Sequence, residues 1–269
     1  MELQPPPPLR FRSLASGSSG NATLVQGRAA DGQAPFYALI DCGLPLRQLR
    51  AQLHTCALTP EDLHAIFVTH EHADHVGPCF DLARRLHIPI WSSYGTWLGA
   101  GRPDCDGMWQ CARDGQTITW GRMQALPFTV PHDAREPLQL RISQEGLHIA
   151  LLTDLGHITP HVLAHARDCQ ALLLEFNHEP DLLAASRYPP FLKRRIAGPQ
   201  GHLANASAAQ LLSQVLHSGL QHVVAAHLSQ QNNRPEHALR WMQQAIGAHP
   251  IALHIATQEA GCDWIHPTL

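Results

Sequence analysis

Four side chains of the kinds that bind metal ions in proteins occur within six consecutive residues, namely His70, His72, Asp74 and His75. Imidazole nitrogen and carboxylate oxygen are ligands that suit Zn²⁺ or Mn²⁺. The apolar run 66–68 (Ile-Phe-Val) precedes them and predicts a buried strand that ends where the ligands begin. Because alternate residues of an extended loop point the same way, we expect His70 and His72 to bind one ion while Asp74 and His75 face a second.

A polar loop that is rich in histidine by chance is the alternative interpretation, since the chain has 20 histidines in 269 residues. The position of the four residues argues against it, because they follow a predicted strand and precede a predicted helix start. Loops at strand ends are held by the scaffold beneath them and carry a large share of binding and catalytic residues. We therefore interpret the segment as a site for two metal ions.

This segment matches in full the HxHxDH signature of the metallo-β-lactamase superfamily, and the chain resembles that superfamily. The resemblance implies an α/β fold, an αββα sandwich of two mixed β-sheets flanked by helices. Size and composition agree with it, because 269 residues of which 44% are hydrophobic can bury a large core in one domain that spans residues 1–269. We expect the proline-rich residues 1–8 to be a flexible lead-in.

The superfamily's later motifs imply three further ligands, each after a predicted strand. His132 matches the third motif, Asp154 matches the fourth, a bridging carboxylate, and His227 resembles the fifth. His202 competes with His227 for the last position, but His227 ends an apolar β-type run as the other ligands do. The expected ligands are His70, His72 and His132 for the first ion, Asp74, His75 and His227 for the second, and Asp154 for both.

His202 has a second interpretation that depends on Glu175, which ends the apolar run 171–174. In phosphodiesterase members of the superfamily, a Glu after this strand and a His in a Gly-His segment form a pair that protonates the leaving oxygen. Glu175 and His202 match those places, although an ordinary strand-end glutamate and a histidine before a helix would look the same. The expected catalytic residues are Asp74, Glu175 and His202.

Substrate contacts are expected from three places in the chain. Ser18 and Ser19 lie in the Gly/Ser segment 16–21, whose backbone N–H groups can cradle a phosphate or simply form a tight turn. Asn177 follows Glu175 closely. Lys193, the only lysine, and Arg194 belong to the only tight basic cluster, which is either a phosphate contact or a solvated face.

Other elements follow from local patterns. Asp41, after the predicted strand 38–40, resembles the buried aspartate that the superfamily places beneath its ligand loop. Apolar periodicity predicts a helix over 205–216, with Asn205 as its N-cap and Gly219 as its stop signal. The segment 94–115 is rich in Gly, Asp, Trp and Cys, and we expect its acidic residues and cysteines to lie on a surface loop.

Segments along nearly the whole chain resemble the YycJ-like (WalJ) branch of the superfamily, among them LIDCG, VTHEHADH, TDLGH, YPPFLKRRIAG and GHLANASAA. Members of that branch are associated with exonuclease action from the 5′ end of DNA. One departure is Ala204, since the branch often has Ser in this GHLSN motif. The resemblance implies a metal-dependent phosphodiester hydrolase that uses a hydroxide activated by two Zn or Mn ions, with DNA or RNA as substrate.

Charge and cysteine usage limit this hypothesis. The net charge of −3 gives no global basic field to recruit nucleic acid, so small cyclic phosphodiesters, thioesters and lactones remain alternative substrates, and a non-catalytic metal-dependent binding module remains an alternative function. The seven cysteines include no CxxC pair, which indicates reduced thiols and a cytoplasmic location. We expect no signal peptide and no membrane span, because no apolar stretch is long enough.

Overall fold

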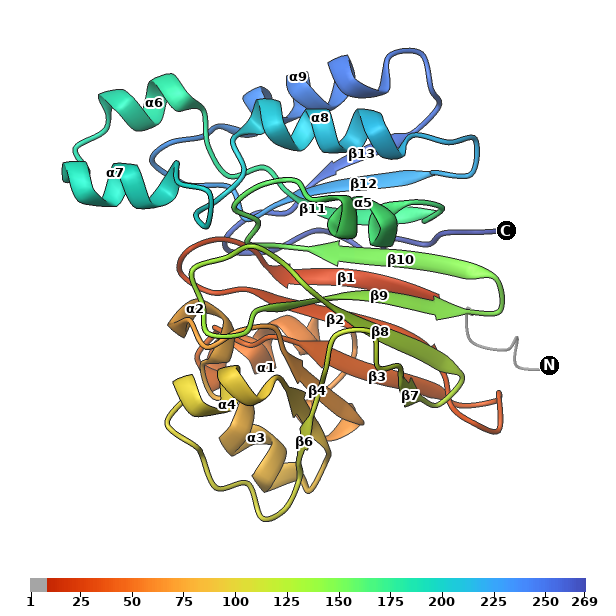
Figure 1. Ribbon diagram of the computed structural model, residues 1–269. Helices are drawn as coiled ribbons and strands as arrows, with labels where there is room; N and C mark the ends of the chain where they lie inside the picture. Colours follow the sequence, from red (N-terminus) through yellow and green to blue (C-terminus); the bar gives the residue numbers. More distant parts are fainter. Residues whose placement is uncertain (1–8) are drawn as a thin grey trace.

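The computed structural model describes residues 9–269, so the predicted lead-in lies outside the described residues. Two mixed β-sheets pack face to face, and helices cover the outer face of each sheet (Figure 1). This layering confirms the predicted αββα sandwich. Among the described helices, none combines the length and the apolar character needed to cross a membrane.

The first sheet has the strand order β1-β2-β3-β4-β5-β6. Its strands are β1 (Leu9–Ala15), β2 (Ala22–Arg28), β3 (Pro35–Ile40), β4 (Ala65–Val68), β5 (Ile90–Ser92) and β6 (Trp109–Cys111). Strands β1 to β3 are antiparallel and β3 to β6 are parallel. The helices along this part of the chain are α1 (Leu46–His54), the 3₁₀ turn η1 (Pro60–Asp62), α2 (Ala73–Val76), α3 (Cys79–Leu86) and α4 (Tyr94–Gly99).

The second sheet has the order β13-β12-β11-β10-β9-β8-β7. Its strands are β7 (Ile118–Trp120), β8 (Met123–Thr129), β9 (Leu138–Gln144), β10 (Leu147–Leu152), β11 (Ala171–Glu175), β12 (His222–Ala226) and β13 (Ala252–Ile255). Strands β7 to β10 are antiparallel and β10 to β13 are parallel. The associated helices are α5 (Pro160–Ala166), α6 (Pro180–Ala185), α7 (Pro190–Ile196), α8 (Asn205–Val215) and α9 (Pro235–Ile246).

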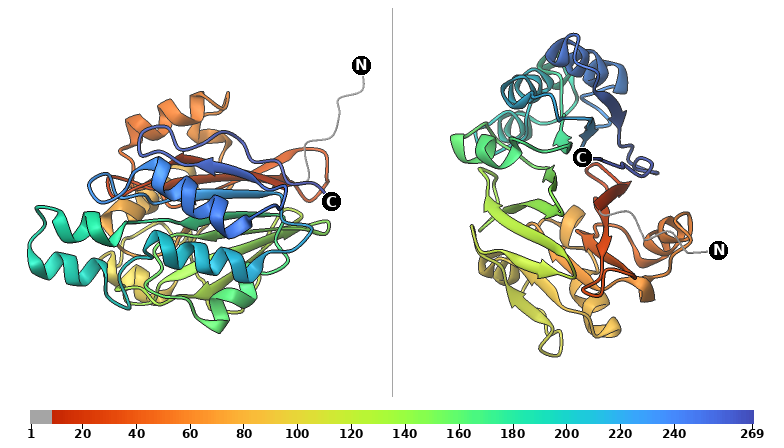
Figure 2. Two further views of the ribbon diagram at one scale, coloured as in Figure 1. Left: turned by 90° about the horizontal axis from the view of Figure 1, so that it is seen from above. Right: turned by 90° about the vertical axis from the view of Figure 1, so that its right-hand side faces the viewer.

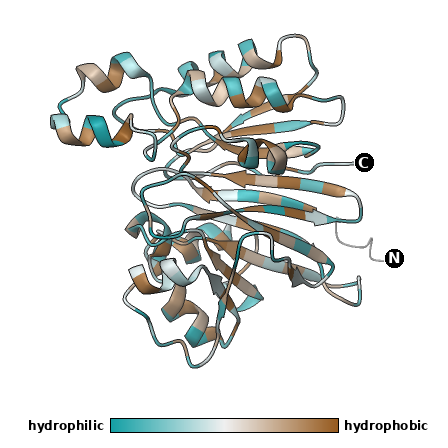
Figure 3. Ribbon diagram, viewed as in Figure 1, coloured by the Kyte–Doolittle hydropathy of each residue, from teal (hydrophilic) through white to brown (hydrophobic). Residues whose placement is uncertain are grey.

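Three apolar cores hold the layers together. Phe11, Phe67 and Trp120 are fully buried between the two sheets. A second core joins the second sheet to α5, α8 and α9, and a third joins the first sheet to α1 and α3. Figure 3 shows hydrophobic and hydrophilic residues alternating along the strands and helices, as expected for elements with one face buried.

The parallel strands end at one common edge of the sandwich. Strands β10, β11 and β12 run side by side in the same direction, and β3 and β4 do so in the other sheet. In Figure 1 these strand ends face left, toward α2 and toward the α6–α7 pair, and Figure 2 shows the same arrangement from two other directions. Polar residues that follow these strands are therefore brought to one place.

Three local predictions were wrong. Asn205 is not an N-cap, because Ala204 holds that position and the Asn205 side chain instead donates to Glu179 and Asn233 inside the fold. Helix α8 ends at Val215, before Gly219. The segment 94–115 is not only a surface loop, since it contains α4 and the edge strand β6. The ring of Trp97 from α4 stacks on the ring of Trp109 from β6.

Candidate functional site

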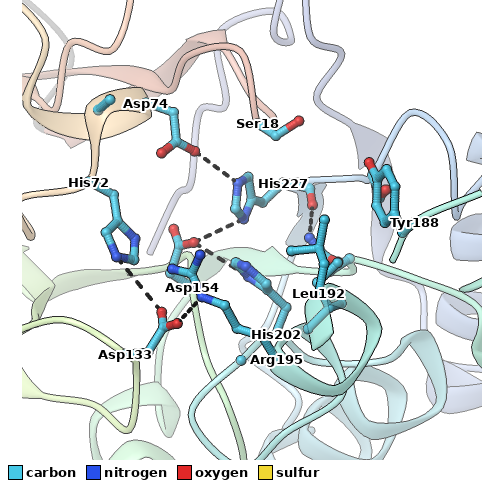
Figure 4. Close-up of a pocket in the computed structure, with 15 residues that line it drawn as sticks. Ser18, His72, Asp74, Asp133, Asp154, Tyr188, Leu192, Arg195, His202 and His227 are labelled. Atoms are coloured by element: carbon cyan, nitrogen blue, oxygen red, sulfur yellow. Dashed lines mark hydrogen bonds and ion pairs between the residues drawn. The ribbon is translucent and has the colours of Figure 1, made fainter. Parts of the chain in front are cut away.

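The HxHxDH segment follows β4 and runs into α2. His70 and His75 are fully buried, whereas His72 and Asp74 are partly exposed at the surface of a pocket (Figure 4). Helix α2 begins directly after His72, so the chain turns sharply between the two pairs of ligand-type residues. The four side chains therefore face two adjoining points, as their spacing predicts.

Three imidazoles converge on the first point. The His72 Nδ1 atom lies 3.1 Å from His70 Nε2 and 3.3 Å from His132 Nε2. His132 comes from the loop after β8, in the other sheet. These three nitrogens form one of the groups of side chains whose geometry could hold a metal ion.

A second group consists of Asp74, His75 and His227. The Asp74 Oδ2 atom lies 3.7 Å from His75 Nε2 and 3.5 Å from His227 Nε2. Asp154 lies between the two groups, with Oδ2 at 2.9 Å from His75 Nε2 and Oδ1 at 3.8 Å from His132 Nε2. The structure thus brings together all seven residues that the motifs predict as ligands.

Neighbouring groups fix the orientation of the rings. The buried Asp41 carboxylate bonds to His75 Nδ1 at 2.8 Å and accepts hydrogen bonds from the backbone N–H and the hydroxyl of Thr69. His132 Nδ1 lies 3.0 Å from the carbonyl oxygen of Gly201. Such contacts turn the opposite nitrogen, Nε2, toward the other groups of the cluster. The buried Asp41 lies beneath the HxHxDH segment, as its resemblance predicts.

Three strand-end residues adopt the left-handed backbone conformation. The φ angles are 59° at Asp41 after β3, 52° at Asp154 near the end of β10, and 54° at His227 after β12. This conformation costs about 1 kcal/mol or more for a residue other than glycine, and Asp tolerates it better than most. The surrounding structure holds the three residues in this conformation. The resulting sharp change in chain direction turns their side chains into the site.

Glu175 and His202 form the predicted pair. The Glu175 Oε1 atom lies 2.7 Å from His202 Nδ1 and 3.1 Å from His227 Nδ1, while Oε2 accepts from the backbone N–H groups of Leu155 and Leu203. Burial opposes ionisation of Glu175, but His202 outweighs it and lowers the glutamate pKa to about 2. Burial likewise disfavours charged His202, yet Glu175 raises the histidine pKa above its usual value.

The donor set fits divalent cations. Burial disfavours ionisation of Asp154, but His227 and His75 hold its pKa well below the usual range, so its carboxylate is anionic. His227 Nε2 and Asp154 Oδ2 are buried, and the polar atoms that face them, Asp74 Oδ2 at 3.5 Å and His75 Nε2 at 2.9 Å, belong to the same ligand groups. A divalent cation held between these nitrogen and oxygen donors would satisfy them together.

The pocket beside these groups has a volume of about 390 Å³. Of the predicted substrate contacts, Ser18 and Asn177 line it. Ser19 lines a neighbouring hollow, and its backbone N–H donates to Gln258. Lys193 and Arg194 do not line the pocket: Arg194 is exposed elsewhere on α7, and Lys193 Nζ donates to the carbonyl oxygen of Ala184.

Among the pocket residues that the sequence did not single out as substrate contacts are Tyr188, Leu192 and Arg195 (Figure 4). The Arg195 guanidinium contacts the Asp133 carboxylate, which in turn lies 3.8 Å from His72 Nε2. Leu192 and Arg195 are three residues apart on α7, and this spacing, which places both on one side of a short helix, was the available signal. It selects Arg195, and not its neighbours Lys193 and Arg194.

Comparison with known proteins identifies the family. The model of the beta-lactamase superfamily domain matches residues 37–255. The chain is 32% identical to exodeoxyribonuclease YycJ of Bacillus anthracis over 244 residues, which cover 88% of this chain and 89% of the relative. It is 30% identical to exodeoxyribonuclease WalJ of Streptococcus pneumoniae over 232 residues, 84% of either chain.

A solved structure gives the same fold at low sequence identity. The metallo-beta-lactamase fold protein YhfI from Bacillus subtilis superposes with a TM-score of 0.71 and 14% identity, covering 96% of this chain and 99% of YhfI. The family match, the shared fold and the cluster of histidines and aspartates agree with one another. The chain belongs to the beta-lactamase superfamily and is a metal-dependent hydrolase of the metallo-β-lactamase fold.

Proposed function

We propose that this hydrolase cleaves phosphodiester bonds of nucleic acid with two divalent ions, Zn or Mn, as a nuclease of the 5′-to-3′ DNA exonuclease type. The observation that carries the proposal is the juxtaposition of two ligand groups, joined by Asp154, with the Glu175–His202 pair in the same pocket. Exodeoxyribonuclease is the name of the YycJ and WalJ relatives, which align with most of the chain. RNA has the same phosphodiester chemistry and belongs in the test.

The proposed ligands fall into the two groups of side chains described above, one for each ion. The first ion is assigned to His70, His72 and His132, the second to Asp74, His75 and His227, with Asp154 shared. When bound, such ions supply Lewis acidity, which lowers the pKa of water toward about 7 and offsets the charge of the phosphate oxygens. Asp74 counts among the catalytic residues because it lines the pocket beside this centre.

His202 is assigned the role of proton donor to the leaving oxygen. Its Nδ1 atom is engaged by Glu175, and among the described residues Nε2 has no hydrogen-bond partner, so this nitrogen is available to a substrate in the pocket. Glu175 is itself fixed by two backbone N–H groups and keeps the imidazole ring in place. General acid catalysis of this kind contributes about 10²–10⁴-fold to rate.

Ser18, Asn177 and Arg195 are the proposed contacts to substrate within the pocket. Asn177 Nδ2 donates to the carbonyl oxygen of His227, which places the amide beside the second ligand group. Arg195 is the cation that faces the pocket, and a guanidinium suits phosphate oxygens. These contacts compensate locally for the net charge of −3.

Hydrolysis of a small cyclic phosphodiester, a thioester or a lactone is the second candidate, favoured by the limited pocket volume of about 390 Å³. A carbonyl substrate has no need of the Glu175–His202 pair in this role. Hydrolysis of a thioester or a lactone that a His202→Ala variant retains in full, by protein that cleaves no phosphodiester, would therefore favour the carbonyl alternatives.

The deciding experiment uses protein loaded with Mn²⁺ or Zn²⁺ and a panel of 5′-phosphorylated duplex DNA, single-stranded DNA, RNA and bis-p-nitrophenyl phosphate. We expect hydrolysis of DNA from the 5′ end, and none by an Asp154→Asn variant. Wild-type protein that binds metal and cleaves no member of the panel would contradict the proposal and leave a metal-dependent binding module as the better account.

A further inference from the structure

Helices α6 and α7 form a hairpin that projects from the sandwich beside the pocket (Figures 1 and 2). No residue of α7 is fully buried, and Leu183 is the buried residue of α6. A segment with so little buried apolar surface contributes little to the stability of the fold. The exposed residues of this hairpin can therefore serve binding and not folding.

The two faces of α7 differ. One face carries Leu192 and Arg195 and forms a wall of the pocket. The adjoining face carries Phe191, which lies one helical turn before Arg195, together with the exposed Arg194. The side chain of Phe191 is 66% exposed and is one of the large apolar side chains left in solvent. Arg187, also exposed, lies just before the helix. An exposed aromatic ring with cations near it in the sequence is the combination that proteins use to bind single-stranded nucleic acid.

The cationic side chains in and just before α7 differ in whether they have a hydrogen-bond or ion-pair partner. Lys193 Nζ donates to the carbonyl oxygen of Ala184 at 2.6 Å, and Arg195 pairs with Asp133. Arg187 and Arg194 have no acidic partner among residues 9–269. In a chain whose net charge is −3, these two exposed cations, which lie outside the pocket lining, add local positive charge to this helix and the segment before it.

We propose that the outer face of α7, formed by Arg187, Phe191 and Arg194, binds the single strand that extends out of the pocket. A base stacks on the Phe191 ring, and the two arginines contact the neighbouring phosphates. The proposal rests on the proposed nuclease function and adds a substrate track outside the pocket. Stacking on an aromatic side chain accepts every base, so this track confers affinity for a strand and no sequence preference.

The test measures how kcat/KM depends on substrate length. Metal-loaded wild-type protein is compared with Phe191→Ala and Arg194→Gln variants on a dinucleotide, a single-stranded DNA of ten nucleotides and bis-p-nitrophenyl phosphate. We expect Phe191→Ala to lose about tenfold or more on the long strand, because stacking of one base is worth about that factor. Arg194→Gln should also lose activity on the long strand, because it removes a phosphate contact. Activity on the two small substrates should stay unchanged, since Phe191 and Arg194 lie outside the pocket lining.

Two controls separate a specific track from general effects. Arg240→Gln removes an exposed cation from α9, outside the pocket lining, and should leave all three activities unchanged. Phe191→Trp keeps an aromatic face and should restore the long-strand activity. The salt dependence of binding to the long strand should weaken in Arg194→Gln by about 0.7 in the slope of log K against log salt concentration.

The outcomes distinguish this inference from the proposed function. Variants that retain wild-type preference for the long strand, in a protein that cleaves all three substrates, overturn the track and leave the nuclease function intact. Wild-type protein that cleaves no phosphodiester contradicts the function itself. Equal losses on long and short substrates would place α7 in the pocket chemistry and also overturn the track.

Discussion

Glu175 is the residue on which two parts of the site depend. One of its oxygens contacts both His202 and His227, and the other accepts two backbone N–H groups. Its place after β11 predicts a role in leaving-group protonation, and the structure adds a contact with His227, a proposed metal ligand. Substitutions of Glu175 and of His202 should therefore differ in their effects.

His202→Ala should lower kcat on DNA by about 10²-fold or more, because an alkoxide leaving group needs a proton. The same variant should lose far less on bis-p-nitrophenyl phosphate, whose nitrophenolate leaves without protonation. Steady-state kinetics on both substrates measure the difference. Equal losses on the two would assign His202 to metal binding or to folding.

Glu175→Gln should lower activity on both substrates, because it disturbs the contact that orients His227. Residues that orient metal ligands typically contribute about 10–100-fold to metal affinity or activity. We therefore expect the metal concentration for half-maximal activity to rise by such a factor in Glu175→Gln and to stay unchanged in His202→Ala. Unchanged metal dependence in both variants would restrict Glu175 to its role beside His202.

At the scale of elements, the site depends on how closely two loops approach each other. The loop after β3 packs against α2, where Cys42 N–H donates to the carbonyl oxygen of His75 at 2.8 Å. A Cβ atom on Gly43 would lie 1.9 Å from the carbonyl oxygen of Asp74, and one on Gly77 would lie 2.0 Å from that of Cys42. Glycine at these positions allows α2 to bring Asp74 and His75 against β3.

Gly43→Ala should therefore move α2 away from β3 and disrupt the second ligand group. We expect a loss of about 1–3 kcal/mol in the free energy of unfolding from overpacking, and a lower content of bound metal. Thermal unfolding and metal analysis measure the two effects. Gly219→Ala is the matched control, because the nearest atom to its Cβ is a His217 side-chain atom at 3.1 Å. Full metal content in Gly43→Ala would show that the loops tolerate the shift.

At the scale of the whole molecule, the ligands come from both sheets. His70, His72, Asp74 and His75 follow a strand of the first sheet, whereas His132, Asp154 and His227 follow strands of the second. Bound ions would therefore connect the two layers in addition to the core between them. Ligands that bind only the folded state stabilise it by mass action.

Removal of metal by a chelator should lower the melting temperature. At a metal concentration about 100 times Kd the lost stabilisation is about 2.7 kcal/mol, which corresponds to about 5–10 °C for a chain of this size. Calorimetry with and without chelator measures the shift, and Mn²⁺ or Zn²⁺ added back should reverse it. In Asp154→Asn, the chelator should have little effect. An equal shift in that variant would indicate that the metal acts elsewhere.

The sequence predicted those parts of the molecule that follow from local pattern or from motifs. The four layers, the HxHxDH segment and the strand ends that carry Asp154 and His227 were all correctly placed. The role of Asn205 was not predictable, because its partners Glu179 and Asn233 are distant in sequence and outcompete the helix cap. Arg195 was missed because three consecutive cations do not by themselves show which side chain faces the pocket. That becomes clear only when the bounds of α7 are known.

The Gly/Ser loop near the start of the chain contacts two proposed metal ligands that are far apart in the sequence, His75 and His227. Ser16 Oγ accepts from the His227 N–H at 2.7 Å, and Asn21 Nδ2 lies 3.0 Å from His75 Nε2. His227 follows Ser16 by 211 residues, so the loop can hold it only once β12 has formed. A chain without β12 therefore keeps the Gly/Ser loop and has an incomplete second ligand group.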